Sequence, residues 1–215
     1  MFECQLEKMI QKIEEIVRNF HSDALLSFRN YKKMAERAVD QISDYEFFAL
    51  IDEESNSIAL IVKHIAGNLR SRWTDFLTTD GEKEFRKRDT EFELIEDTRE
   101  SLMQFWESSW QTLFDSVEPL TVEDFSRTVT IRGEPHTVVE ALNRQLMHYA
   151  FHIGQIVMLA KHFKSVDWQT LSVPKNRSAD FNQFLADKQA AGESKTDRME
   201  TSFAFAETEK EKSEP

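Results

Sequence analysis

The stretch that decides the fold is RQLMHYAFHIGQI, residues 144–156. It lies within a hydrophobic segment that we expect to form a helix over residues 137–163. Apolar side chains fall on nearly every side of this helix, a pattern typical of a helix at the centre of a bundle. One polar strip runs along it, formed by Arg144, His148, His152 and Gln155. Buried polar side chains need partners or a function.

Two histidines of this strip have the spacing of a metal site. His148 and His152 are four residues apart, so on a helix they share one face, about 6 Å apart along its axis. A third histidine from elsewhere would leave a coordination position open, as in catalytic zinc sites. The candidate is His64, in the apolar band of a second expected helix at 58–76. The alternative is that His64 is a hydrogen-bonded core residue, which is the more common role of a histidine on an apolar face.

The composition favours an all-α protein with a sizeable core. The 215 residues are 40% hydrophobic and 11% aromatic, and 5 Gly and 4 Pro are too few for a turn-rich β fold. The formal net charge of -12 disfavours nucleic acid as a partner, because phosphate binding needs a basic face. Cys4 is the single cysteine, which excludes an intramolecular disulfide and a cysteine-based zinc cluster.

No segment indicates a membrane or secretory protein. Residues 1–17 carry charges every few positions, so they lack the apolar centre of a signal peptide. No apolar run approaches the ~18 residues needed to cross a bilayer. We therefore expect a cytoplasmic protein without a membrane partner.

The spacing of apolar residues predicts two further helices. The first spans residues 1–43, where the polar residues 21–23 could divide it in two, and His21 in that break is expected to be solvated. The other spans residues 95–117. At the far end of the chain, residues 189–215 are charged and rich in small side chains, which is typical of a disordered tail.

Two connections have distinct patterns. Residues 128–137 alternate around a Gly-Glu-Pro turn and predict a small β-hairpin, with His136 outside the buried region. Residues 77–94 form an irregular, highly charged loop, and a loop this long is either functional or a crossover. Its charges fit a solvated surface. They also fit a flap over a site, in which Arg86 or Arg88 meets an anionic ligand group.

The histidines favour one kind of chemistry. Three neutral imidazoles suit Zn²⁺, Ni²⁺ or another divalent first-row ion. The HEXXH protease motif requires Glu directly after its first histidine, whereas Tyr149 follows His148 here. Binding of an anionic oxygen or a thiolate is the more natural use of such a site.

Three segments carry a resemblance to a known family. They are NSIALIVKHIAGNLRSRWTDFLTTDGEKEFRKRDTEFE (56–93), HTVVEALNRQLMHYAFHIGQIV (136–157) and LSVPKNRS (171–178). Across residues 22–185 the chain resembles the DinB-like (YfiT-like) superfamily, in particular a Bacillus-type branch. The resemblance implies a four-helix bundle of DinB type over residues 1–188, with a long crossover between its second and third helices.

The resemblance also implies a site and a class of activity. It places metal ligands at His64, His148 and His152, and dimers are common among relatives. Relatives include S-transferases that use bacillithiol or mycothiol and a mycothiol-dependent maleylpyruvate isomerase, in which the metal activates the thiol as thiolate. For this chain it implies zinc or nickel and a low-molecular-weight thiol such as bacillithiol.

Three functions remain open. The leading hypothesis is a thiol S-transferase acting on small electrophiles, with Arg144 as the candidate catalytic residue and Arg86, Arg88 and Asn68 as candidate cofactor-binding residues. The second is metal-assisted hydrolysis, which needs a carboxylate base, and the fourth helix has no Asp or Glu between Glu140 and Asp167. The third is a non-catalytic metal-binding or stress-response bundle. The expected partners are a small-molecule substrate and a second copy of the chain.

Overall fold

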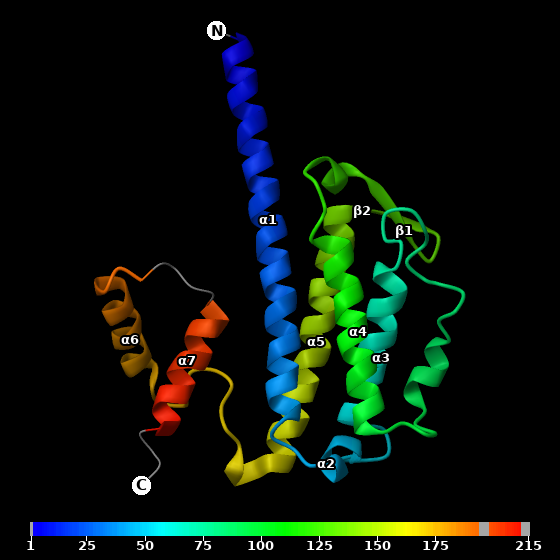
Figure 1. Cartoon of the computed structure of the whole chain (residues 1–215), viewed down its shortest axis with the longest axis vertical. Helices are drawn as coiled ribbons and strands as arrows, with labels where there is room; N and C mark the ends of the chain where they lie inside the picture. Colours follow the sequence, from blue (N-terminus) through cyan, green and yellow to red (C-terminus); the bar gives the residue numbers. More distant parts are fainter. Residues whose placement is uncertain (1, 194–197, 212–215) are drawn as a thin grey trace.

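A computed structural model describes residues 2–193 and 198–211 (Figure 1). The order of elements is α1 (Phe2–Val39), α2 (Asp44–Phe48), α3 (Ile58–Trp73), η1 (Arg88–Phe92), α4 (Arg99–Val117), η2 (Glu123–Ser126), β1 (Thr128–Ile131), β2 (Glu134–Thr137), α5 (Val138–Lys164), η3 (Ser165–Asp167), α6 (Ser178–Ala190) and α7 (Arg198–Glu211). The elements labelled η are 3₁₀ helices. The structure is thus mainly helical with one small sheet, which confirms the all-α prediction.

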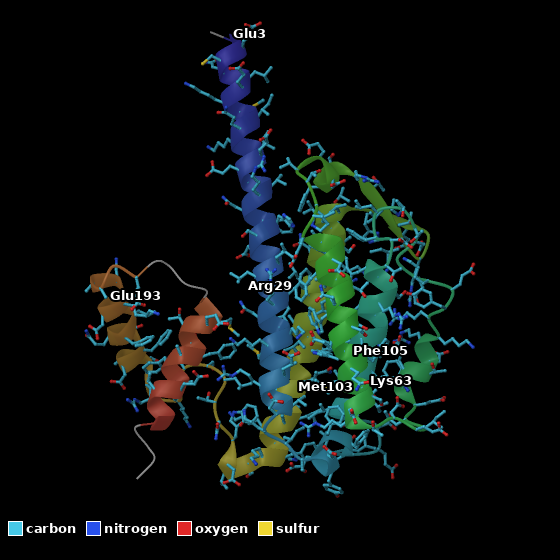
Figure 2. All side chains as sticks on the ribbon, in the orientation of Figure 1. Glu3, Arg29, Lys63, Met103, Phe105 and Glu193 are labelled. Atoms are coloured by element: carbon cyan, nitrogen blue, oxygen red, sulfur yellow. The ribbon has the colours of Figure 1, made fainter. Side chains whose placement is uncertain are left out.

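Four long helices, α1, α3, α4 and α5, lie side by side (Figure 1). α3 packs against α4 and α5, and α1 packs against α5 and α4. Side chains fill the space between their ribbons (Figure 2). The largest fully buried ones are aromatic and include Phe28, Trp73, Trp106, Trp110 and Tyr149. This core fixes α3 and α5 against each other, and the candidate site lies between these two helices.

Polar capping residues set the start of the helices that carry the site. Ser57 caps α3, Thr98 caps α4 and Thr137 caps α5, each by accepting a hydrogen bond from a backbone N–H of the first turn. α5 therefore begins where it was predicted. α4 begins at Arg99 and not at residue 95, because the side chain of Thr98 satisfies its first free N–H groups.

The predicted hairpin is present. β1 and β2 pair antiparallel, from Thr128 opposite Thr137 to Ile131 opposite Glu134. Its two-residue turn, Arg132–Gly133, has positive φ at both positions (56° and 77°), the conformation of the tight turns that match the twist of a hairpin. Glycine at the second position adopts this conformation without strain.

The connection between α3 and α4 is anchored to this hairpin. The Asp80 carboxylate accepts hydrogen bonds from the backbone N–H groups of Arg132 (2.9 Å) and Gly133 (2.8 Å). The Gly81 N–H donates to the Thr130 carbonyl at 2.8 Å. The connection also contains the 3₁₀ helix η1, so the prediction of an irregular loop over 77–94 is wrong there.

α1 differs from its prediction at residues 21–23, where it continues without a break. His21 is half-buried and not solvated, because this face of α1 meets the end of α4. Its Nε2 lies 2.8 Å from the carbonyl oxygen of Val117, and its ring packs edge-on to Phe125. His136 is half-exposed on β2. Neither α1 nor any other described helix is long and apolar enough to cross a membrane.

The chain beyond α5 forms two further helices, α6 and α7. Phe203 on α7 is 1% exposed and belongs to the main apolar cluster. Arg37 of α1 lies over its ring and also pairs with Glu207. We expected a disordered tail over 189–215, whereas the described part of it includes the helix α7. A few aromatic side chains anchor this segment, although its average composition is polar. Residues 194–197 and 212–215 lie outside the described residues, and the boundary at residue 188 stays a prediction.

Candidate metal centre

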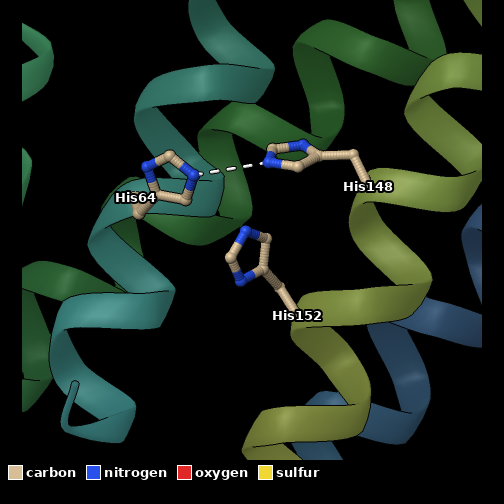
Figure 3. A group of neighbouring side chains, drawn as sticks. All are labelled: His64, His148 and His152. Atoms are coloured by element: carbon tan, nitrogen blue, oxygen red, sulfur yellow. Dashed lines mark hydrogen bonds between the residues drawn. The ribbon is translucent and has the colours of Figure 1, made fainter. Parts of the chain in front are cut away.

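Three histidines converge between α3 and α5 (Figure 3). His64 comes from α3, His148 and His152 come from α5, and one ring nitrogen from each lies within 4.8 Å of the other two. The Nε2 atoms of His64 and His148 are 3.4 Å apart. Two nitrogens bound to one tetrahedral zinc ion stand about 3.3 Å apart, given zinc–nitrogen distances of about 2.0–2.1 Å. The spacing therefore fits a shared ion.

Hydrogen bonds on the outer side of two rings orient them. His64 Nδ1 lies 2.9 Å from Oε2 of Glu91, and His152 Nδ1 lies 2.8 Å from Oε1 of Gln155. An Nδ1–H that donates to such an oxygen leaves the lone pair on Nε2, which faces the centre of the group. His148 has no such support: its buried Nδ1 has no hydrogen-bond partner among the described residues.

The surroundings keep the imidazoles of His148 and His152 neutral. Burial, with the nearby His152, His64 and Arg86 acting in the same direction, lowers the pKa of His148 to about 3. Burial also lowers the pKa of His152, although its bond to Gln155 opposes the shift. Metal ions bind the neutral form of histidine. These two ligands are therefore in the binding form at neutral pH.

Glu91 is the main residue that sequence reasoning missed. Its carboxylate is buried beside His64, and Arg86 binds it through two hydrogen bonds, Nε to Oε1 at 2.7 Å and Nη2 to Oε2 at 2.9 Å. Burial raises the pKa of Glu91, but the hydrogen bonds from His64 and Arg86 outweigh burial and leave the pKa lowered. The carboxylate thus stays ionised, and such a partner raises the basicity of a histidine ligand.

A glycine makes room for this carboxylate. A Cβ atom on Gly67 would lie 2.2 Å from Oε1 of Glu91, which is far inside contact distance. A glycine inside a helix costs stability and often has a packing reason. Gly67 was therefore a sequence signal of a close contact on α3 about one turn after His64, but the sequence did not identify the residue that makes this contact.

The other predicted site residues have different surroundings. Asn68 is buried and accepts a hydrogen bond from the Tyr149 hydroxyl at 3.0 Å. Arg86 is committed to Glu91 and to Glu82. Arg86 thus supports His64 through Glu91, Asn68 joins α3 to α5 through Tyr149, and a cofactor-binding role for either stays a prediction.

Two of the predicted site residues, Arg88 and Arg144, are exposed. Arg88 lies over the ring of Phe92, 5.2 Å from its centroid. Arg144 lies on the surface of α5, one turn before His148. Phe92 in turn packs on His64, with ring centroids 5.1 Å apart. Arg88 is thus separated from the histidines by an aromatic ring, whereas Arg144 stays a candidate at the rim.

The donor set fits a first-row divalent ion. Three imidazole nitrogens suit zinc, nickel or copper and are a poor match for calcium or magnesium, which prefer oxygen. The group comes from two helices and contains no thiolate or carboxylate. Three protein ligands leave a fourth position for water or a substrate atom.

Comparison with known proteins assigns the chain to a family. The profile described as "Protein of unknown function (DUF1572)" matches residues 15–177. The chain therefore belongs to this family, and the match includes all three histidines and Glu91. Neither a curated protein nor a solved structure matches the chain.

Proposed function

We propose that this member of the DUF1572 family binds a divalent metal ion, zinc or nickel, through His64, His148 and His152. The bound ion activates a small thiol of the bacillithiol type for transfer to an electrophile. The proposal makes the protein an S-transferase of the DinB-like superfamily, with α1, α3, α4 and α5 as its four-helix bundle.

One observation supports the proposal above all others. Three buried or half-buried imidazoles from two helices present nitrogens within 4.8 Å of one another. Core histidines that serve packing alone have their ring nitrogens paired with protein donors or acceptors. Here the inner nitrogens meet one another, and the outer nitrogens of His64 and His152 are held by Glu91 and Gln155.

The chemistry follows from the ligand set. A bound ion of this kind lowers the pKa of a thiol ligand, so that the reactive thiolate forms at neutral pH. The protein holds the three rings in position through Glu91, Gln155 and the packing of α3 on α5. The ring of Phe151 lies beside His152, with centroids 5.1 Å apart, and Phe92 covers His64.

The same residues give less support to a hydrolase. Hydrolysis needs a carboxylate that takes a proton from the attacking water. The nearest described carboxylate, Glu91, binds Nδ1 on the outer side of His64, and Arg86 occupies both of its oxygens. Its lowered pKa makes it a weak base. Thiol activation needs no such base.

The proposal includes a homodimer. Exposed apolar side chains form two stripes: Leu6, Met9, Ile10, Ile13 and Ile16 on α1, and Met147, Phe151 and Met158 on α5. Exposed apolar patches of this kind mark interaction surfaces. Analytical ultracentrifugation at several concentrations measures the assembly directly, and a monomer at high concentration contradicts this part of the proposal.

The activity is tested with an electrophile that reports thiol transfer. Zinc-loaded protein, supplied with bacillithiol, should consume monochlorobimane faster than the thiol alone. Metal-free protein and the His148→Ala variant should show the background rate. If the folded, metal-loaded protein leaves the background rate unchanged with every thiol tested, the transferase proposal fails. The non-catalytic metal-binding function is then favoured.

A further inference from the structure

Arg72 is a buried cation with free donors beside the proposed site. It lies on α3, eight residues after His64, which is about 12 Å along the helix axis and about 80° around it. The residue is 4% exposed. Its Nε and Nη1 atoms have no hydrogen-bond partner among the described residues, and Nη2 lies 4.0 Å from Oε2 of Glu82, too far for a hydrogen bond.

The nearby carboxylates are already occupied. Oε2 of Glu82 also lies 3.3 Å from Nη1 of Arg86 and 3.3 Å from Nε of Arg132. Asp80, which is close enough to interact electrostatically with Arg72, binds the backbone N–H groups of Glu82, Arg132 and Gly133. Arg72 is therefore left without a dedicated anion.

The described part of the chain encloses Arg72 without a hydrogen bond to its Nε or Nη1. A Cβ atom on Gly81 would lie 2.5 Å from Nη1 of Arg72, so the backbone of the connection closes one side of the guanidinium. The Ser71 hydroxyl fixes this backbone, donating to the Gly81 carbonyl at 3.1 Å and accepting from the Lys83 N–H at 3.0 Å. Burial lowers the pKa of Arg72, but arginine remains charged at neutral pH. A buried charge whose donors are not satisfied is costly to a fold and requires an explanation.

A buried acceptor on α5, Oε1 of Gln145, has no hydrogen-bond partner among the described residues and lies level with Arg72 along the bundle. Asn68 of α3 contacts Tyr149 of α5, and the two helices run antiparallel (Figure 1). The residue one turn after Asn68 is Arg72, and the residue one turn before Tyr149 is Gln145. These two are therefore level with each other. Gln145 is 1% exposed, and its Oε1 has no hydrogen-bond partner among the described residues.

We propose that Arg72 binds the carboxylate of a ligand whose other end is held at the three-histidine site. The guanidinium donors face an acid group in the geometry that arginine uses for carboxylates. Gln145 accepts a hydrogen bond from a neighbouring N–H or O–H of the same ligand, and Arg144 adds positive charge at the rim. The ligand class is a short thiol acid, with a metal-binding sulfur at one end and a carboxylate several bonds away.

This inference rests on the proposed metal-bound thiol, so the test uses two thiols of equal length. Cobalt-loaded protein is titrated with 6-mercaptohexanoate and with 6-mercaptohexanol, and binding is followed by the sulfur-to-cobalt absorption band. The acid should bind at least tenfold more tightly than the alcohol. Arg72→Met should remove this preference and leave the affinity for the alcohol unchanged, whereas Arg72→Lys should retain part of it.

Arg70→Met is the matched control, because Arg70 is an exposed arginine two residues away on the same helix. It should bind both thiols as the parent protein does. Arg72→Met should unfold at a urea concentration no lower than the parent protein, since it removes a buried charge with two unsatisfied donors. Equal affinity for acid and alcohol in the parent protein overturns the inference. So does an acid preference that survives in Arg72→Met, or a large loss of stability in both Arg72 variants.

Failure of the proposed function gives a different pattern. If neither thiol changes the cobalt spectrum, the thiol-activation proposal fails, and hexanoate then tests Arg72 by itself. Hexanoate should raise the urea midpoint of the metal-free parent protein and of Arg70→Met, but not that of Arg72→Met. The absence of this shift in the parent protein overturns the carboxylate site independently of the metal.

Discussion

Two polar clusters between packed helices differ in how completely they are paired. The α1–α4 cluster consists of Lys32, Glu36, Trp106 and Glu107. Lys32 Nζ lies 2.6 Å from Glu36 and 2.7 Å from Glu107, and the Trp106 indole N–H donates to Glu36 at 3.1 Å. Lys32, the most enclosed charge of this cluster, has two carboxylate partners.

The α3–α5 cluster contains the three histidines, Arg72 and Gln145, and it is incompletely paired. Polar atoms of His148, Arg72 and Gln145 lack partners among the described residues. α4 also leaves the Ser109 hydroxyl and the Trp110 indole N–H without a partner among the described residues, but neither lies beside an unsatisfied charged group such as Arg72. Because the charges of the α1–α4 cluster are paired, this cluster is explained as a stabilising contact between helices. The unpaired α3–α5 cluster is better explained by a ligand, and each prediction below probes this difference.

The largest effect is expected for His148→Ala. Loss of one of three ligands should weaken zinc binding about 1,000-fold or more, because the two remaining histidines form an incomplete site. The unfolding free energy of the metal-free protein should change by only about 1 kcal/mol, since the variant also removes an unsatisfied buried nitrogen. Competition with a chelator of known affinity measures the first quantity, and urea unfolding the second. Unchanged zinc affinity would refute the site.

The next effect concerns the support behind His64. Glu91→Gln should weaken zinc binding about 10- to 100-fold, as is usual for carboxylates that orient a histidine ligand. Gly67→Ala should act in the same direction, because its new Cβ would meet Glu91. Gly154→Ala is the control: a Cβ on that helical glycine would have no atom within 4 Å. Equal zinc affinity in Gly67→Ala and Gly154→Ala would show that Glu91 does not act through His64.

A third effect is the pH dependence of the metal-free protein. The folded-state pKa of His148 is about 3, below the value of about 6.5 in an unfolded chain. As the pH falls below about 6.5, the unfolded chain takes up a proton that the folded chain excludes, so stability decreases. The metal-free parent protein should lose of the order of 2 kcal/mol more than His148→Gln between pH 6.5 and pH 5. Parallel urea-unfolding profiles of the two proteins would contradict the burial of an uncharged His148.

The smallest effect is expected in the α1–α4 cluster. Glu36→Gln weakens the ion pair with Lys32, whose side chain is 19% exposed while that of Glu36 is 30% exposed. It should lower the unfolding free energy by about 1 kcal/mol, the scale of a partly solvated pair. Zinc affinity should not change. A fall in zinc affinity as large as that of Glu91→Gln would remove the distinction between the two clusters.

The sequence predicted the fold where one pattern repeats along the chain. Apolar spacing located α1, α3, α4 and α5, and Thr137 marked the start of α5. It failed where a local signal was ambiguous: residues 21–23 could begin a helix, yet α1 runs through them without a break. The helix α7 was missed because Phe203 and Phe205 are few among many polar residues.

The site was predictable only in part, for a physical reason. The spacing of His148 and His152 is local to one helix, and His64 stood out as a polar residue in an apolar band. Glu91 was hidden because it meets His64 across the long connection, within a charged segment that is typical of a solvated surface. Arg72 was hidden because its burial depends on how the connection folds back over α3.

X-ray absorption of the zinc-loaded protein tests the central claim most directly. The account predicts three imidazole nitrogens at about 2.0–2.1 Å and one further light atom. Addition of a thiol should replace that atom with sulfur at about 2.3 Å. A zinc ion with fewer than three imidazoles, or with mainly oxygen ligands, would contradict the three-histidine site between α3 and α5.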